Sequence, residues 1–191
     1  GATTLIGVLM ALRMGKSDKS IAIGLGFSAG IMLEISFLEL IPNSFSAAGI
    51  DSLIALFLGF LFIYVVNLII PHTHLVKEKG KVNLLLKTVY LIAIGLVLHD
   101  FPEGFAMANS YIFAPALGVL VAVSIAIHNI PEEFAMAVPL VLAKKRGLLL
   151  KVALLSALAE PLGAVMGLFA VAAAPSLNAL FMAYAAGAMI L

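Results

Sequence analysis

Two short segments of this 191-residue chain share one pattern of residues that can bind metal ions. They read LHDFPEGFAMA at residues 98–108 and IHNIPEEFAMA at residues 127–137. Residues four apart lie on the same face of a helix, so His99 is expected beside Glu103, and His128 beside Glu132. Each pair could clamp a metal ion through an imidazole nitrogen and a carboxylate oxygen. Two imidazoles and two carboxylates form a donor set that suits zinc and other first-row divalent ions.

A proline directly precedes each motif glutamate and is expected to bend its helix at the site. Pro102 and Pro131 each remove one helical hydrogen bond, which frees the carbonyl groups of Leu98 and Ile127. Freed backbone groups are tolerated at membrane depth where they line a hydrated cavity. The prolines therefore favour a bend at which a hydrated ion could lie.

Three more polar residues could form a second site beside the first. Asp100 and Asn129 each follow a motif histidine by one residue, so they point about 100° further around the helix. Glu160 is another carboxylate in an apolar segment and lies directly before Pro161. The sequence thus allows two adjacent sites that share a motif glutamate.

A weaker signal lies in residues 20–47, where Met32, Ser36 and Glu39 fall roughly on one helix face. Met32 could supply a thioether ligand at mid-depth, although methionine more often fills gaps in a core. Glu39 is expected nearer the outer membrane surface.

Other polar residues have no definite role in the sequence. Glu34 could face a cavity or a neighbouring subunit, and Glu133 could hold helices together or act as an auxiliary ligand. His72 and His74 are expected to be solvated loop residues.

The composition is that of an integral membrane protein. Hydrophobic residues make up 63% of the chain, with a mean hydropathy of +1.19, whereas soluble domains contain roughly 45–50% apolar residues. Zero cysteine excludes disulfides and thiolate metal sites. The apolar segments are too long for barrel strands of about 9–11 residues, so we expect an all-α polytopic transmembrane bundle. Its seven segments lie near residues 1–13, 20–47, 52–71, 84–109, 113–143, 150–174 and 177–191, the first and last being partial.

All 11 lysines and arginines lie in alternate loops, at residues 13–19, 77–87 and 144–151. The positive-inside rule then places these basic loops in the cytoplasm of a multi-pass cell-membrane protein. In contrast, these acidic residues lie within apolar segments: Glu34, Glu39, Asp100, Glu103, Glu132, Glu133 and Glu160. A charge at the bilayer centre costs at least about 2.5–3.5 kcal/mol, so a bound cation is expected to offset that cost.

These features resemble the ZIP (Zrt-/Irt-like) family of zinc and iron permeases, and most of all its bacterial branch of broad-range divalent metal uptake. The resemblance rests on the paired motifs, on SAGIML at residues 28–33 and on AEPLG at residues 159–163. It implies an eight-helix fold with both termini outside, a binuclear metal centre between the fourth and fifth helices, and alternating access. Residues 1–191 are then expected to form one transmembrane transporter domain that lacks part of the first helix and the eighth.

The resemblance also implies roles for individual residues. The first site it implies consists of His99, Glu103, His128 and Glu132, with Met32 nearby. The second consists of Asp100, Asn129 and Glu160, bridged by the motif glutamates, and Glu39 takes an external gate position. This sequence departs from the family pattern at Asp100, where asparagine is usual, and at Glu133, where glycine is usual. The added negative charge could tighten binding, admit a proton-coupled step or shift metal preference.

The function expected from these observations is uptake of divalent transition metals, with zinc foremost and cadmium, iron, manganese and cobalt as further candidates. Zinc or a similar ion would be the transported substrate; no prosthetic group and no nucleic-acid partner are expected, and a homodimer is left open.

An alternative is a metal-dependent intramembrane hydrolase that uses a metal-bound water. The chain has no His-Glu-x-x-His motif and no lysine or arginine expected within the membrane to bind an anionic substrate, so we do not expect an enzyme. A metal-gated channel or sensor is a third alternative.

Overall fold

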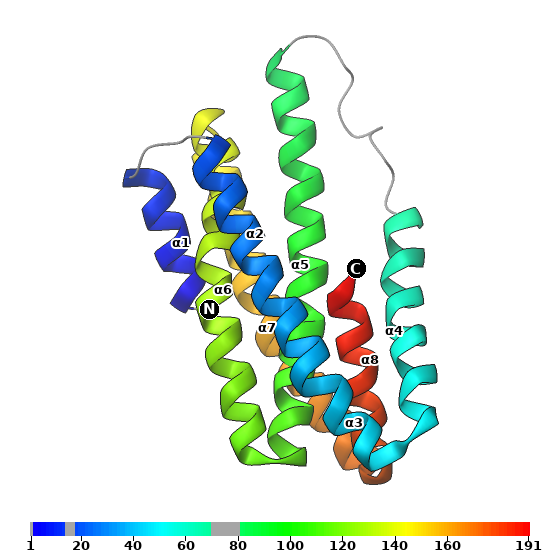
Figure 1. The fold of residues 1–191 in the computed structure, drawn as a ribbon. Coiled ribbons are helices and arrows are strands. Elements are labelled where there is room, and N and C mark those ends of the chain that lie inside the picture. The colour runs from blue at the N-terminus through cyan, green and yellow to red at the C-terminus, as the bar shows by residue number, and fades with distance from the viewer. Residues whose placement is uncertain (1, 14–17, 70–80) are drawn as a thin grey trace.

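The computed structural model describes residues 2–13, 18–69 and 81–191, which form a bundle of helices (Figure 1). The helices are α1 Ala2–Arg13, α2 Asp18–Glu34, α3 Ile41–Ala48, α4 Ile50–Ile69, α5 Lys81–Phe113, α6 Pro115–Leu142, α7 Arg146–Ala173 and α8 Asn178–Ile190. A π-helix, η1 (Ile35–Leu40), joins α2 to α3, and a 3-10 turn, η2 (Pro175–Leu177), precedes α8. The described residues contain no strand, so the expected all-α bundle is confirmed.

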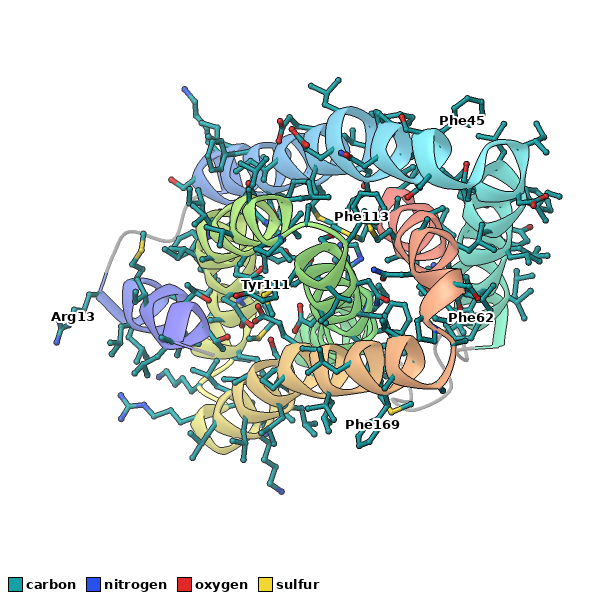
Figure 2. The ribbon with its side chains drawn as sticks, turned by 90° about the horizontal axis from the view of Figure 1, so that it is seen from below. Arg13, Phe45, Phe62, Tyr111, Phe113 and Phe169 are labelled. Carbon is teal, nitrogen blue, oxygen red and sulfur yellow. The ribbon has the colours of Figure 1, made fainter. Side chains whose placement is uncertain are left out.

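The surface of the bundle is apolar, as expected of a protein in lipid. Large hydrophobic side chains point outward, with Leu150 73% and Phe169 67% exposed (Figure 2). Exposed apolar surface on this scale is rare in soluble monomers. Within the described residues, four helical stretches are long and apolar enough to cross a membrane: Lys19–Ala48, Ile50–Leu68, Pro115–Leu142 and Arg146–Ala173.

The described basic residues near the helix ends and the turns without lysine or arginine lie at opposite ends of the bundle. The end of α1, the start of α2 and the turn between α6 and α7, with Arg13, Lys19 and Arg146, lie at one end of the bundle (Figure 1). The turns between α3 and α4, α5 and α6, and α7 and α8 lie at the other end. These predicted loop residues lie outside the described part of the chain: Lys16, His72, His74, Lys77 and Lys79.

Helix α5 lies at the centre of the bundle and packs against α6, α7 and α8. Its contact with α7 is a close backbone crossing. A Cβ atom added at Gly104 would collide with the carbonyl of Glu160, and one at Gly163 would collide with that of Phe101. Small residues of this kind let helices approach closely in lipid. The crossing holds Glu103, the neighbour of Gly104, at a fixed place in the core, where it is fully buried.

The sequence predicts one segment over residues 20–47, and the structure divides it by the π-helix. Pro42 has no backbone N–H, and the N–H of Ile41 donates to the carbonyl of Ser36, five residues back. Side chains satisfy neighbouring carbonyl groups: Asn43 Nδ2 donates to Glu39 O at 2.7 Å, and Ser44 Oγ donates to Leu40 O at 2.6 Å. Short π-helical turns are frequent at functional sites, and this one follows Met32 by less than one turn.

Candidate metal centre

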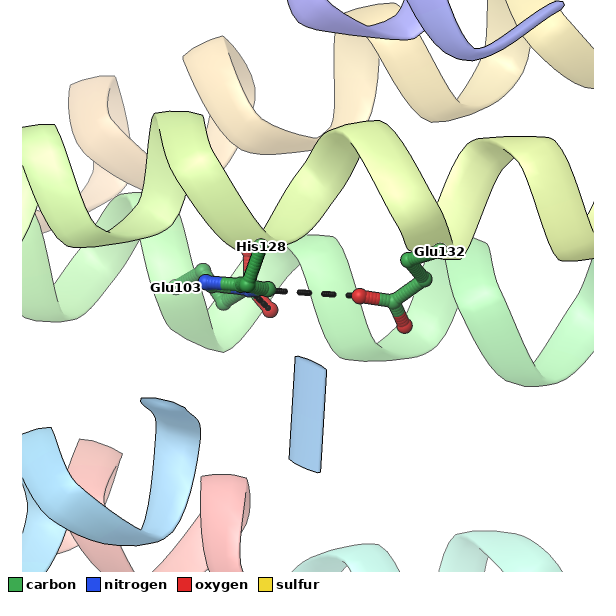
Figure 3. A group of neighbouring side chains, drawn as sticks. All are labelled: Glu103, His128 and Glu132. Atoms are coloured by element: carbon green, nitrogen blue, oxygen red, sulfur yellow. Dashed lines mark hydrogen bonds and ion pairs between the residues drawn. The ribbon is translucent and has the colours of Figure 1, made fainter. Parts of the chain in front are cut away.

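Three ionisable side chains converge between α5 and α6 (Figure 3). Glu103 comes from α5, and His128 and Glu132 come from α6; one ligand atom of each lies within 4.8 Å of the others. His128 Nε2 is 3.0 Å from Glu103 Oε1 and 3.9 Å from Glu132 Oε2. Ligands of one zinc ion, each about 2.0–2.2 Å from it, stand at comparable separations. The structure thus brings together three of the four residues in the predicted helical pairs.

The two ring nitrogens of His128 have different partners. Nδ1 lies 3.0 Å from the carbonyl oxygen of Ser124, which can only accept a hydrogen bond, so Nδ1 is the donor. In a neutral imidazole the other nitrogen, Nε2, then presents a lone pair toward Glu103. A metal-binding histidine usually has this arrangement, with its second N–H anchored on a carbonyl or carboxylate.

The fourth predicted ligand, His99, lies next to this cluster. Its Nε2 is 3.5 Å from Glu103 Oε1 and 3.1 Å from Met32 Sδ. Met32 is 5% exposed and reaches the site from α2. The structure therefore places the thioether sulfur within reach of an ion held by His99.

Helix α2 contributes a second contact that the sequence analysis does not predict. Ser28 Oγ donates a hydrogen bond to Glu132 Oε2 at 3.2 Å. Ser28 precedes Met32 by four residues, so both lie on the same face of α2. Each ligand atom thus lies close to the next in a chain of side chains that begins and ends on α2: Met32, His99, Glu103, His128, Glu132 and Ser28.

The residues of the predicted second site fall into two places. Asn129, 5% exposed, donates from Nδ2 to Glu160 Oε2 at 3.4 Å. With the nitrogen and oxygen of its amide exchanged, Nδ2 instead donates to Glu103 Oε2 at 3.3 Å. Asp100 faces α7 and accepts a hydrogen bond from Ser156 Oγ at 2.6 Å. Asn129 therefore lies between Glu160 and the first site, whereas Asp100 belongs to a different group of contacts.

The remaining acidic residues of the apolar segments have different degrees of burial. Glu34 is exposed, Glu39 is half-buried on η1, and Glu133 is 3% exposed. Glu34 lies about 200° around the helix from Met32, so it faces away from the metal centre.

A cavity of about 580 Å³ adjoins the metal centre. Its polar lining consists of Ser28, Asn67, His99 and Glu132, and Met32 also contacts it. The lining includes Ile21, near the start of α2, and Pro139, near the end of α6. The cavity therefore extends from the ligands toward the end of the bundle that carries the basic residues.

Comparison with known proteins gives matches over most of the chain. The model of the ZIP zinc transporter family matches residues 70–191. The zinc transporter ZupT of Chlorobium limicola is 38% identical in an alignment 188 residues long, which covers 87% of this chain and 71% of the relative. ZupT of Salmonella paratyphi A is 33% identical in an alignment 118 residues long, which covers 56% of this chain but only 45% of the relative. The chain belongs to the ZIP zinc transporter family, and the resemblance to its bacterial branch expected from the paired motifs is confirmed.

Proposed function

We propose that this chain is the membrane part of a divalent metal uptake transporter whose main substrate is zinc. The observation that carries the proposal is the convergence of Glu103, His128 and Glu132 within 4.8 Å. His99 and Met32 extend this donor set. The names of the Chlorobium and Salmonella relatives agree with zinc as the substrate.

The charges around the site favour a cation as the bound species. No lysine or arginine occurs between Lys87 and Lys144, so neither motif helix has a basic side chain near its metal-binding residues. Buried carboxylates without a positive partner are costly. A divalent ion bound by Glu103 and Glu132 would supply that charge at the depth where transporters commonly bind their ions.

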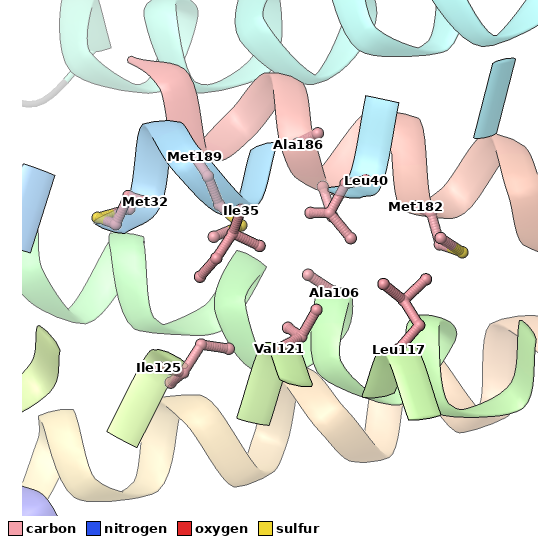
Figure 4. Packing of buried hydrophobic residues seen from close by; sticks show 11 residues of the cluster. Met32, Ile35, Leu40, Ala106, Leu117, Val121, Ile125, Met182, Ala186 and Met189 are labelled. Carbon is pink, nitrogen blue, oxygen red and sulfur yellow. The ribbon is translucent and has the colours of Figure 1, made fainter. Parts of the chain in front are cut away.

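The two sides of the metal centre differ in a way that supports alternating access. The cavity extends toward the end of the bundle with the basic residues, whereas a cluster of buried apolar residues lies toward the other end, where α6 and α8 begin. Figure 4 shows how this cluster packs. That cluster includes Ile35, Leu40, Val121, Ile125 and Met182, each fully buried. If the basic residues face the cytoplasm, as the positive-inside rule predicts, the site is reached from inside and closed from outside. Transport would then require this apolar cluster to separate.

We also propose that the centre can hold a second ion beside the first. Asn129 and Glu160 lie next to each other, and Asn129 is within hydrogen-bonding reach of Glu103. A second ion bound by Asn129 and Glu160 could share the Glu103 carboxylate with the first. Two ions close together would repel one another, which would help release one of them into the cavity.

Zinc uptake by the purified chain in liposomes tests the proposed function. We expect His128→Ala and Glu132→Gln to lower uptake by more than about tenfold, since losing a group that merely orients a ligand typically costs roughly 10- to 100-fold. Glu34→Gln is the matched control, because this carboxylate is exposed and faces away from the site. Uptake that persists in both site variants would contradict the proposal. Ester or peptide hydrolysis without zinc flux would favour the hydrolase alternative.

A further inference from the structure

A second group of acidic side chains faces α1 and α7 instead of α2. Asp100 on α5, Glu133 on α6 and Ser156 on α7 are 4%, 3% and 2% exposed. The Ser156 hydroxyl lies 2.6 Å from Asp100 Oδ2 and is also hydrogen bonded to Glu133 Oε1. None of the three belongs to the cluster formed by Glu103, His128 and Glu132.

The hydrogen bonds of this group are incomplete. A serine hydroxyl has one hydrogen, so Ser156 can donate to only one of the two carboxylates at a time. The other carboxylate then faces a lone pair of the hydroxyl oxygen. The second oxygen of Glu133, Oε2, is buried and has no hydrogen-bond partner. The Thr4 hydroxyl on α1 is also hydrogen bonded to Glu133, but neither this hydroxyl nor that of Ser156 carries a positive charge, so a cation among the oxygens would offset the charge of the two buried carboxylates.

The packing of α1 explains why a glutamate fits at this position. Gly104 and Glu133 are equivalent in the two motifs, each following the motif glutamate by one residue. At Gly104 the backbone of α7 crosses so closely that no side chain fits. At Glu133 the small residue lies instead on the neighbouring helix, α1. A Cβ atom added at Gly7 of α1 would lie 2.7 Å from Glu133 Cβ and 2.6 Å from Ile130 O. The small residue on α1 thus makes room for a carboxylate that the first motif excludes.

We propose that Asp100, Glu133 and Ser156 bind a divalent cation. This site is separate from the proposed zinc centre, which is the cluster of Glu103, His128 and Glu132 with His99 and Met32 beside it. The donors are two carboxylates and a hydroxyl, all oxygen, whereas the zinc centre also offers imidazole and thioether groups. Oxygen donors suit manganese, magnesium and calcium better than they suit softer ions. The three ligands come from α5, α6 and α7, so a bound cation would link the two motif helices to α7. This proposal does not depend on transport by the zinc centre.

Titration of the purified 191-residue chain with Mn²⁺ tests the site, because free Mn²⁺ gives an electron paramagnetic resonance signal that is lost on binding. We expect Glu133→Gln and Asp100→Asn to weaken binding at one Mn²⁺ site by at least about tenfold, since each removes a charged ligand. Ser156→Ala keeps both carboxylates and should weaken binding less. His128→Ala removes a ligand of the zinc centre alone and should retain the Mn²⁺ site, and Glu34→Gln controls for the loss of one carboxylate. Circular dichroism and size-exclusion chromatography select the variants that fold.

The outcomes separate this site from its alternatives. Loss of one Mn²⁺ site in both Glu133→Gln and Asp100→Asn, with retention of that site in His128→Ala, supports the proposal. Equal binding by wild type and both acidic-site variants overturns it. Loss in His128→Ala of the same Mn²⁺ site that the acidic-site variants lose also overturns it, because that ion would then belong to the cluster of Glu103, His128 and Glu132. Absence of Mn²⁺ binding by the wild type overturns it too, since a shared proton would then neutralise the two carboxylates. These experiments measure Mn²⁺ binding and not zinc uptake. Their results therefore do not depend on whether the proposed transport function is correct.

Discussion

At the scale of single residues, the proposed zinc centre combines donors of different softness. His128 and Glu103 offer nitrogen and oxygen, which suit zinc, iron and cobalt, whereas Met32 offers a polarisable sulfur. Met32 Sδ lies 3.1 Å from His99 Nε2, so an ion bound by this histidine could also contact the thioether. The sulfur would therefore contribute more to the binding of soft ions than to the binding of hard ones.

Replacement of Met32 by leucine tests this contribution, because leucine keeps most of the side-chain volume and removes the sulfur. We expect cadmium affinity to fall by about tenfold, equivalent to about 1.4 kcal/mol, and zinc affinity to fall by less. Competition titrations with both metals measure the two affinities. Met182→Leu, at the far end of the same apolar cluster (Figure 4), is the control. A parallel loss of zinc and cadmium binding in Met32→Leu would indicate a packing role for this residue.

At the scale of helices, some of the site follows from periodicity and some depends on tertiary packing. The pairing of His99 with Glu103 could be predicted because residues four apart in a helix always share a face. Ser28 and Ser156 could not be predicted, since their roles depend on which faces of α2 and α7 meet the motif helices. The π-helix also has no local signal besides Pro42, because a proline in a long apolar segment is compatible with several kinds of bend. The helical segments themselves were predictable because lipid requires long apolar runs.

The crossing of α5 and α7 gives a prediction at this scale. Gly104→Ala adds a methyl group that collides with the α7 backbone, so the helices must move apart. Overpacking of this kind typically costs about 1–3 kcal/mol. We expect a lower thermal midpoint in detergent and weaker zinc binding, because Glu103 adjoins the crossing. Gly26→Ala is the control, since a Cβ at Gly26 has no atom within 4 Å. Equal midpoints for both variants would show that the close crossing is not required.

At the scale of the whole molecule, the placement of charge predicts how the bundle lies in the membrane. The described basic loop residues lie at one end of the bundle, and the cavity extends toward that end. The positive-inside rule therefore predicts that the cavity opens to the cytoplasm. A chain of this topology would release a bound ion inward in the conformation described here.

The absence of native cysteine makes this orientation simple to measure. Asp51 and Lys145 are both exposed and lie at opposite ends of the bundle. We expect a membrane-impermeant maleimide to label Asp51→Cys in intact cells, because the positive-inside rule places the turn between α3 and α4 on the outer side. Lys145→Cys should react only after the membrane is permeabilised. The reverse pattern would show that the basic residues face outward and that the cavity opens to the outside.

The central claim is that α5 and α6 together bind the transported ion through their paired motifs. Anomalous diffraction from crystals of the zinc-loaded chain tests it most directly, because the peak at the zinc absorption edge locates the ion among its ligands. We predict a peak about 2.0–2.1 Å from His128 Nε2, with Glu103 and Glu132 oxygens also bound. Zinc found only at loop residues, with no peak between α5 and α6, would contradict the account.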